Sequence, residues 1–467
     1  MEQIARESQE WDRQWQHEIA YVLHRLFRLG LRMRERKFKP ALRKRILKWM
    51  RRENVEATAS PREEFSMIHV AILVPSLVAT APGRSWTQIT QQSALNKARE
   101  ILSSKESMRE AMLLEGQEAL DMVDLLDQTA DVFSGIYRQR AMWLLSRLCK
   151  RCGLLPSSCC ISEVLQRITR DPLFTGGFAD VYRGQLGSRD VALKVLRVFG
   201  GSSGRNDVLK AFCKEAALWK RLRHPNVVPF LGVSTTAFEG RLCLLSPWLA
   251  HGHVRMYLED HPDSNRLKFL LDVTLVLEYL HSLRVTHGDL KGVNILIDDD
   301  LRARLADFGL TVISSDPSVA QAMDVTTAMQ EAGSTRWMAP ELFDPSVPCA
   351  PNTASDIYAL AMVFWEIFAG ENPFPEMRME PAVIQKVSRG DRPPRPLFGL
   401  SLGLSDPIWA LMERCWQHQS ALRPGVEEIV PIVQKAHAAF IPARATMPRK
   451  PDANDDRSSL DALFVDK

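Results

Sequence analysis

Three short motifs, close together and in a fixed order, constrain this chain more strongly than any other feature. Asp289 can accept a proton from a hydroxyl group, and Lys291 supplies a cation close by in the sequence. Asn294 and Asp307 offer the hard oxygen ligands that magnesium ions prefer. Phosphoryl transfer needs such groups, because it depends on an oriented hydroxyl and on neutralised phosphate charge. The motifs are HGDLKGVN at 287–294, DFG at 307–309 and APE at 339–341.

A glycine-rich segment and a lysine-bearing strand precede these motifs. Gly176 and Gly177 lie in the sequence GGFADVY, and Lys194 ends the sequence VALK. Glycines allow backbone N–H groups to approach a phosphate closely. Lys194 lies among apolar neighbours, so we expect it to be paired rather than solvated. Its expected partner is Glu215, on a helix predicted at residues 210–223 by apolar residues at helical spacing.

In this order the motifs resemble those of protein kinases. The lysine at position 291 is similar to the one that the serine/threonine kinases of the tyrosine-kinase-like group carry in the same motif. The resemblance covers residues 168–440. It implies an α+β, two-lobed fold with a small β-rich N-lobe and a large helical C-lobe. It also implies transfer of the γ-phosphate of ATP, with Mg²⁺, to protein hydroxyls.

The resemblance assigns a role to each candidate site residue. Lys194 would hold the α and β phosphates, and Ser246 would be the small residue at the back of the adenine pocket. Pro247 would offer its carbonyl to the adenine, while Leu249 would donate its N–H. The residues expected to sandwich the adenine are Val181, Ala192 and Leu296, those expected in catalysis are Asp289, Lys291 and Asn294, and those expected to bind the metal are Asn294 and Asp307.

Three further residues distinguish a protein substrate from a small-molecule substrate. Asp356 resembles the buried aspartate that anchors the catalytic loop, and Arg423 resembles the arginine that pairs with Glu341 of the APE motif. Small-molecule phosphotransferases of the aminoglycoside type have a similar HGD loop but lack this segment and this ion pair. The resemblance therefore implies a protein substrate.

The glycine-rich segment departs from the GxGxxG pattern. Phe174 takes the place of the first glycine and Ala179 that of the third, so Gly176 alone keeps its position, with Gly177 beside it. Fewer glycines predict a stiffer loop, which would slow nucleotide entry or raise the nucleotide concentration that is needed. A pseudokinase scaffold that binds partners with little or no turnover is therefore the alternative. The intact charged groups favour the active enzyme, because they matter most to this chemistry.

Gly288 takes the place of an arginine that most kinases carry. That arginine pairs with a phosphorylated activation loop, so we predict that loop phosphorylation does not switch this enzyme on. Alanine at the loop hydroxyls tests this prediction, and a loss of activity that acidic residues restore would contradict it. These hydroxyls belong to Ser314, Ser315, Thr326, Thr327 and Ser334.

The N-terminal sequence predicts helices that the resemblance does not cover. Residues 25–52 contain thirteen Lys or Arg against one acid, on an amphipathic helical pattern. Three interpretations stay open: a bundle helix with a solvated face, contact of residues 11–52 with an anionic membrane, and nuclear targeting or nucleic acid. No motif gives a strong nucleic-acid signal. These helices could also hold a protein partner.

Domain boundaries follow from these patterns. We predict a basic amphipathic segment at 1–56, a regulatory or docking helical region at 57–167, the kinase domain at 168–440 and a disordered tail at 441–467. The apolar stretch 68–81 contains a proline and is shorter than the ~18–20 residues that a spanning helix needs. Eight cysteines and no visible secretory signal favour a cytoplasmic protein, with peripheral membrane or nuclear location left open.

Overall fold

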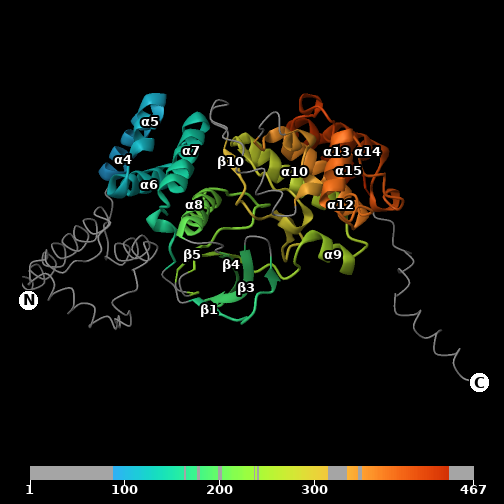
Figure 1. Cartoon of the computed structure of the whole chain (residues 1–467), viewed down its shortest axis with the longest axis horizontal. Helices are drawn as coiled ribbons and strands as arrows, with labels where there is room; N and C mark the ends of the chain where they lie inside the picture. Colours follow the sequence, from blue (N-terminus) through green and yellow to red (C-terminus); the bar gives the residue numbers. More distant parts are fainter. Residues whose placement is uncertain are drawn as a thin grey trace, which may run out of the picture.

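The computed structural model describes residues 88–161, 165–175, 179–197, 202–235, 237–238, 241–313, 334–344 and 350–440. These residues form the expected two lobes, and a layer of helices lies against one side of them (Figure 1). The basic segment 1–56, the apolar stretch 68–81, Gly176, Gly177 and the tail 441–467 lie outside the described residues.

The N-lobe is built on an antiparallel sheet in the order β1-β3-β4-β6-β5, with β2 also paired to β3. Strands β3 and β4 pair along their whole length, so that Val181 lies directly opposite Lys194. The strands are β1 Leu165–Arg167, β2 Phe174–Thr175, β3 Ala179–Leu186, β4 Arg189–Leu196, β5 Gly232–Ser234 and β6 Cys243–Pro247.

The two faces of this sheet differ, because side chains alternate along a strand. Tyr182, Leu193 and Val195 are buried on one face, where they pack with Phe238 in a small core. Apart from the buried Ala179, the alternate positions of β3 and β4 are only half-buried and belong to the other face. This alternation brings Lys194 to the same face as Val181.

Helix α8 (Ser202–Trp219) is the long helix of the N-lobe. It begins before the predicted range 210–223, because its first turns are polar and contain Gly204, which removes the apolar period from the sequence. It also ends earlier, since the chain continues from Trp219 in a tighter turn. The N–H groups of Arg221 and Leu222 donate to carbonyls three residues back, at 2.9 and 3.1 Å.

The C-lobe surrounds helix α12 (Thr353–Ala369), whose residues from 355 to 368 are all buried. Asn352 begins α12 with a capping box to Ser355, and Gly370 ends it in a left-handed conformation. This rigid helix lies beneath the catalytic motif. The other C-lobe helices are α9 Val254–Asp260, α10 Arg266–Ser282, α13 Glu380–Arg389, α14 Asp406–Cys415 and α15 Val426–Ala439.

Two short antiparallel sheets hold the catalytic motifs in place. Strands β7 (Val285–Thr286) and β10 (Val312–Ile313) pair with each other, so they bracket the chain from the HGD motif to the DFG motif. Strands β8 (Ile295–Ile297) and β9 (Ala303–Leu305) pair between those motifs. The two sheets bring 287–294 and 307–309 together.

Four N-terminal helices form a layer on the side of α8 away from the sheet, and the last of them packs directly against α8 (Figure 1). The buried residues of these helices belong to the same hydrophobic core as α8 and the C-lobe. Among the helices in the described part of the chain, none is long and apolar enough to cross a membrane. The four helices are α4 Gln88–Ser103, α5 Lys105–Leu113, α6 Gly116–Thr129 and α7 Gly135–Cys152.

Candidate active site

The catalytic loop is fixed from below by Asp356. Its carboxylate accepts hydrogen bonds from the backbone N–H of His287 at 2.8 Å and of Gly288 at 3.0 Å. Gly288 has a φ of +79°, and a Cβ there would lie 3.0 Å from the carbonyl oxygen of Leu310. Any other L-residue at position 288 would therefore be strained. This strain explains why glycine occupies a position where the family pattern has arginine.

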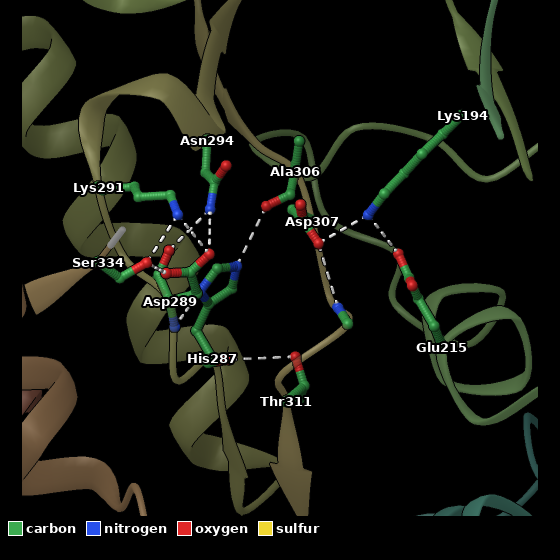
Figure 2. A network of polar contacts seen from close by, with 11 residues as sticks. Lys194, Glu215, His287, Asp289, Lys291, Asn294, Ala306, Asp307, Thr311 and Ser334 are labelled. Carbon is green, nitrogen blue, oxygen red and sulfur yellow. Dashed lines mark hydrogen bonds and ion pairs between the residues drawn. The ribbon is translucent and has the colours of Figure 1, made fainter. Parts of the chain in front are cut away.

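Asp289 is the centre of a buried polar network (Figure 2). Its Oδ2 lies 2.9 Å from Nζ of Lys291 and 3.1 Å from Nδ2 of Asn294, which also donates to the Asp289 carbonyl at 2.8 Å. Its Oδ1 accepts a hydrogen bond of 2.5 Å from Oγ of Ser334. Three donors thus orient one carboxylate, which is the arrangement needed to present it to a substrate hydroxyl.

Ser334 is a site residue that the sequence did not reveal. Only 2% of its surface is exposed, and its Oγ accepts a hydrogen bond of 2.7 Å from Nζ of Lys291 while donating to Asp289. The sequence-based grouping of Ser334 with candidate phosphorylation sites was therefore misleading, because a buried hydroxyl that makes two hydrogen bonds is inaccessible to another enzyme. The other four hydroxyls of that group lie outside the described residues. The sequence signal that could have identified Ser334 is its position shortly before the APE motif.

Ser334→Ala should lower kcat by roughly 10- to 100-fold, because hydrogen bonds to charged groups contribute about 1.5–3 kcal/mol. Ser334→Thr retains the hydroxyl and should keep most of the activity. Steady-state kinetics of both variants test the expectation. An acidic residue at 334 should not restore activity, and full activity of Ser334→Ala would exclude a role for this hydroxyl.

Lys194 joins the two lobes through a second network, also drawn in Figure 2. Its Nζ lies 2.9 Å from Oε1 of Glu215 on α8 and 2.8 Å from Oδ1 of Asp307. The expected ion pair between Lys194 and Glu215 is thus present. Burial alone disfavours the charged ammonium, but the two carboxylates outweigh it and hold the pKa of Lys194 above its usual value. Burial raises the pKa of Glu215.

Asp307 is held in an unusual backbone conformation. Its φ is +66°, and its Oδ1 also accepts from the N–H of Gly309 at 3.3 Å. Burial tends to raise the pKa of this carboxyl, but the charge of Lys194 and the hydrogen bond from it hold the pKa well below its usual range. A strained aspartate that stays ionised is typical of a site in which a carboxylate must face a cation.

Aromatic contacts connect α8 to the catalytic loop. Trp219 of α8 lies 6.0 Å from the ring of Phe308, and Phe308 lies 5.3 Å from the ring of His287. His287 accepts from the N–H of Asp289 through Nδ1 and contacts the Ala306 carbonyl through Nε2, at 3.2 Å each. Packed aromatic rings therefore connect α8 to the backbone of Asp289.

The residues expected around the adenine lie where the lobes meet. Ala192 pairs with Ser246 across β4 and β6, on the face of the sheet that also carries Val181. Leu296 lies on β8 of the C-lobe and is half-buried, as are Val181 and Ala192. Half-buried apolar side chains on both sides are what an aromatic ligand ring needs.

The chain between the lobes continues from β6. Pro247 ends this strand opposite Val191, and Leu249 is partly buried against the core. The N–H of Trp248 donates to the carbonyl of Asp190 at 3.0 Å, which ties the segment to β4. These contacts fix the backbone at both expected adenine-binding residues.

Phe174, which takes the place of the first glycine, contacts another aromatic side chain. The ring of Phe174 lies 6.4 Å from that of Trp248, and 44% of Phe174 remains exposed. Ala179, which replaces the third glycine, is buried. This aromatic contact joins the strand before Gly176 to the segment that connects the two lobes.

Magnesium and nucleotide phosphates fit the groups that converge here. Because Nδ2 of Asn294 donates to Asp289, the amide oxygen of Asn294 is the atom left to face a cation. Asp307 adds a carboxylate that is 39% exposed and ionised. Hard oxygen donors of this kind suit Mg²⁺, and the ammonium of Lys194 suits a phosphate.

The end of the activation segment is anchored as expected. Both terminal nitrogens of Arg423 bond to the carboxylate oxygens of Glu341 at 2.7 Å. The Arg423 side chain is fully buried, and it also donates to the Ala354 carbonyl at 2.9 Å. This two-pronged pair fixes the segment that carries Ser334.

A buried carboxylate beneath the catalytic loop was not anticipated. Glu366 of α12 is fully buried, and its Oε2 accepts from the N–H of Gly292 at 2.8 Å and from Nε1 of Trp337 at 2.9 Å. A side chain at 292 would collide with this carboxylate, so glycine is required there. Burial raises the pKa of Glu366 to about 7, although the hydrogen bonds from Gly292 and Trp337 act in the opposite direction.

Glu366 should make stability fall as pH rises. Its folded pKa exceeds the unfolded value, so the folded state binds the extra proton between about pH 4.5 and 7 and loses it above that window. Relative to Glu366→Gln, the parent should therefore lose roughly 2–3 kcal/mol between pH 5 and pH 8. Denaturant unfolding of both proteins across this range measures the difference. A pH-independent difference would show that Glu366 keeps an ordinary pKa.

Comparison with known proteins agrees with this geometry. A family model described as "Protein tyrosine and serine/threonine kinase" matches residues 168–433. The serine/threonine-protein kinase STY17 of Arabidopsis thaliana is 30% identical over 56% of this chain and 43% of its own length. The serine/threonine/tyrosine-protein kinase HT1 of the same plant is 31% identical over 59% of this chain and 67% of its own. The probable serine/threonine-protein kinase drkD of Dictyostelium discoideum is 31% identical over 57% of this chain and 19% of its own.

The match of the family model includes strands β2 to β6, α8 and the catalytic motifs, whereas β1 and the N-terminal helices lie before the matched residues. The chain spans less than half the length of STY17 and of the related kinase STY46. Because the family model covers more than half of the chain, the assignment rests on the whole two-lobed unit and not on isolated motifs. The chain belongs to the protein tyrosine and serine/threonine kinase family.

Proposed function

We propose that this protein transfers the γ-phosphate of ATP to serine or threonine hydroxyls of a protein substrate. The observation that carries the proposal is that two networks of hydrogen bonds and ion pairs are both formed, one around Asp289 and one around Lys194. Asp289 would orient the substrate hydroxyl and accept its proton, with Lys291 beside the transferring group. Lys194 would hold the α and β phosphates while Glu215 keeps its ammonium in place.

The nucleotide would lie between the lobes. Val181, Ala192 and Leu296 would enclose the adenine, with the Pro247 carbonyl and the Leu249 N–H as its hydrogen-bond partners. Asn294 and Asp307 would hold Mg²⁺. When bound, this ion neutralises phosphate charge. Gly176 and Gly177 complete the proposal as backbone donors to the phosphates, by resemblance alone.

The remaining assignments extend this proposal to the whole chain. We assign residues 168–440 to the kinase domain, 57–167 to a regulatory or docking region and 441–467 to a tail. The protein would act in signalling in the cytoplasm. The N-terminal helices would hold a protein partner, and residues 11–52 would contact an anionic membrane; cosedimentation with anionic and neutral vesicles tests the second role.

Magnesium-dependent phosphorylation of a generic basic protein tests the function. The full chain should phosphorylate serine or threonine, identified by phosphoamino-acid analysis, and chelation of magnesium should abolish the signal. Asp289→Asn and Lys194→Met serve as matched inactive variants. An equal residual signal in all three proteins would contradict the proposal and favour a pseudokinase scaffold, the alternative suggested by Phe174 and Ala179.

A further inference from the structure

Helix α6 carries a buried carboxylate that reaches the end of α8. Asp127 is 5% exposed, and its Oδ2 lies 3.0 Å from Nζ of Lys220. Its Oδ1 pairs with Arg221, which is itself buried, and its Oδ2 also accepts from Ser158. One carboxylate of the N-terminal helices therefore gathers both cations that directly follow α8.

A neighbouring carboxylate strengthens this contact. Asp131 lies just after α6, and its Oδ2 is 2.7 Å from Nη1 of Arg221 and 3.5 Å from Nη2 of Arg223. Burial lowers the pKa of Arg221 to about 10, so the side chain is costly to bury without partners. The two aspartates stabilise this buried cation between the helical layer and the kinase lobes.

Apolar packing joins the same two units over a wider area. Leu145, Leu148 and Cys149 of α7 are buried in one core with Phe212 and Cys213 of α8. Helix α7 thus covers the outer side of α8 at these residues. Helix α8 is held from outside by this layer and from inside by the contacts of the active site.

The layer also reaches the C-lobe. Gln139 of α7 donates to the carbonyl of Ser282, at the end of α10, at 3.3 Å. On the other side, Ile161 donates to the carbonyl of Val233 in β5 at 3.1 Å. The helical layer therefore touches both lobes and α8 between them, so it is placed to fix the position of α8 relative to each.

The clamped end of α8 is close in sequence to its site residues. Trp219, which contacts Phe308, directly precedes Lys220, and Glu215 lies little more than one helical turn earlier. A helix is stiff over this distance, so a shift at Lys220 and Arg221 would displace Glu215 from Lys194. Loss of that contact would remove one of the two carboxylates that orient Lys194.

We propose that Asp127 is a positioning residue for nucleotide binding, and that residues 88–161 hold α8 in the arrangement in which Glu215 engages Lys194. The inference rests on the proposed function and assigns the helical layer an activating role. Asp127 touches no reacting atom and acts through Arg221, Lys220 and α8.

Asp127→Asn in the full chain tests the proposal. We expect the dissociation constant of the ATP–magnesium complex and the KM for ATP to rise by about 10-fold, a size typical of coupling through packed elements. Asp121→Asn is the matched control, because Asp121 is exposed on the same helix. Unchanged nucleotide affinity in Asp127→Asn, with only a lower Tm, would reduce Asp127 to a structural role. Tighter binding or higher activity would make the layer inhibitory; either result overturns the proposal.

A charge reversal covers the case in which Asp127→Asn does not fold. Asp131→Lys places a cation beside Arg221 and Arg223 and should weaken nucleotide binding by about 5-fold. Adding Arg223→Glu should restore much of the affinity, which simple destabilisation would not produce. Failure of this rescue would contradict the proposal that ion pairs between Asp127, Asp131 and the cations after α8 hold this helix in place. A parent without turnover would instead contradict the proposed function, while the binding constants would still decide this inference.

Discussion

Asp289→Asn is expected to lower kcat by about 10³-fold, within the range for loss of a positioned general base. The asparagine amide cannot take up the hydroxyl proton. It also meets donors on both sides, because Ser334 donates to one carboxylate oxygen while Lys291 and Asn294 contact the other. One of these bonds must therefore be lost as well, and the substrate hydroxyl would be misoriented.

The KM for ATP should change by less than about 3-fold in this variant, since Asp289 faces the hydroxyl rather than the nucleotide. Steady-state kinetics with varied ATP separate kcat from KM. Asp299→Asn is the matched control, because it makes the same exchange at an exposed position of the same lobe. Similar kcat values for the two variants would remove Asp289 from the catalytic step.

Lys194→Met is expected to lower kcat/KM for ATP by about 10³-fold and to destabilise the fold by about 3–5 kcal/mol, because it removes one partner of a buried ion pair. The methionine leaves Glu215, of which 4% is exposed, without its cation. It also frees Asp307, which the ammonium holds at 2.8 Å. Unlike Asp289→Asn, this change should therefore affect nucleotide binding, turnover and stability together.

A second substitution separates stability from activity. In Lys194→Met with Glu215→Gln, the buried carboxylate is neutral, so part of the lost unfolding free energy should return while activity stays low. Arg189→Met is the control, since it removes an exposed cation from the same strand. Denaturant unfolding and ATP kinetics give both quantities. Recovered activity in the double variant would show that Lys194 is dispensable to the chemistry.

The sequence was a good guide to residues whose role depends on motif spacing. It predicted the partner of Lys194, because Glu215 lies on the next helix among apolar residues at helical spacing. It also predicted the pair of Glu341 with Arg423, by resemblance. The extent of α8 was predicted less well, since its first turns carry polar residues and a glycine and so lack an apolar period.

The sequence was a poor guide to groups defined by burial. Ser334 looked like one hydroxyl among several in a loop, yet packing brings it against Asp289 and Lys291. Glu366 belongs to no motif in the sequence, yet α12 buries it under Gly292. Asp127 is far in the sequence from Arg221, and nothing in either segment indicates that they meet.

By itself the sequence determined the family chemistry, because phosphoryl transfer requires particular charged groups and the motifs at 287–309 supply them at spacings that resemble those of protein kinases. Tertiary structure alone decided which neutral and distant groups orient those charges. Hydrogen bonds and ion pairs gain their strength from burial and from exact placement, and both arise only when α6, α8 and α12 pack together.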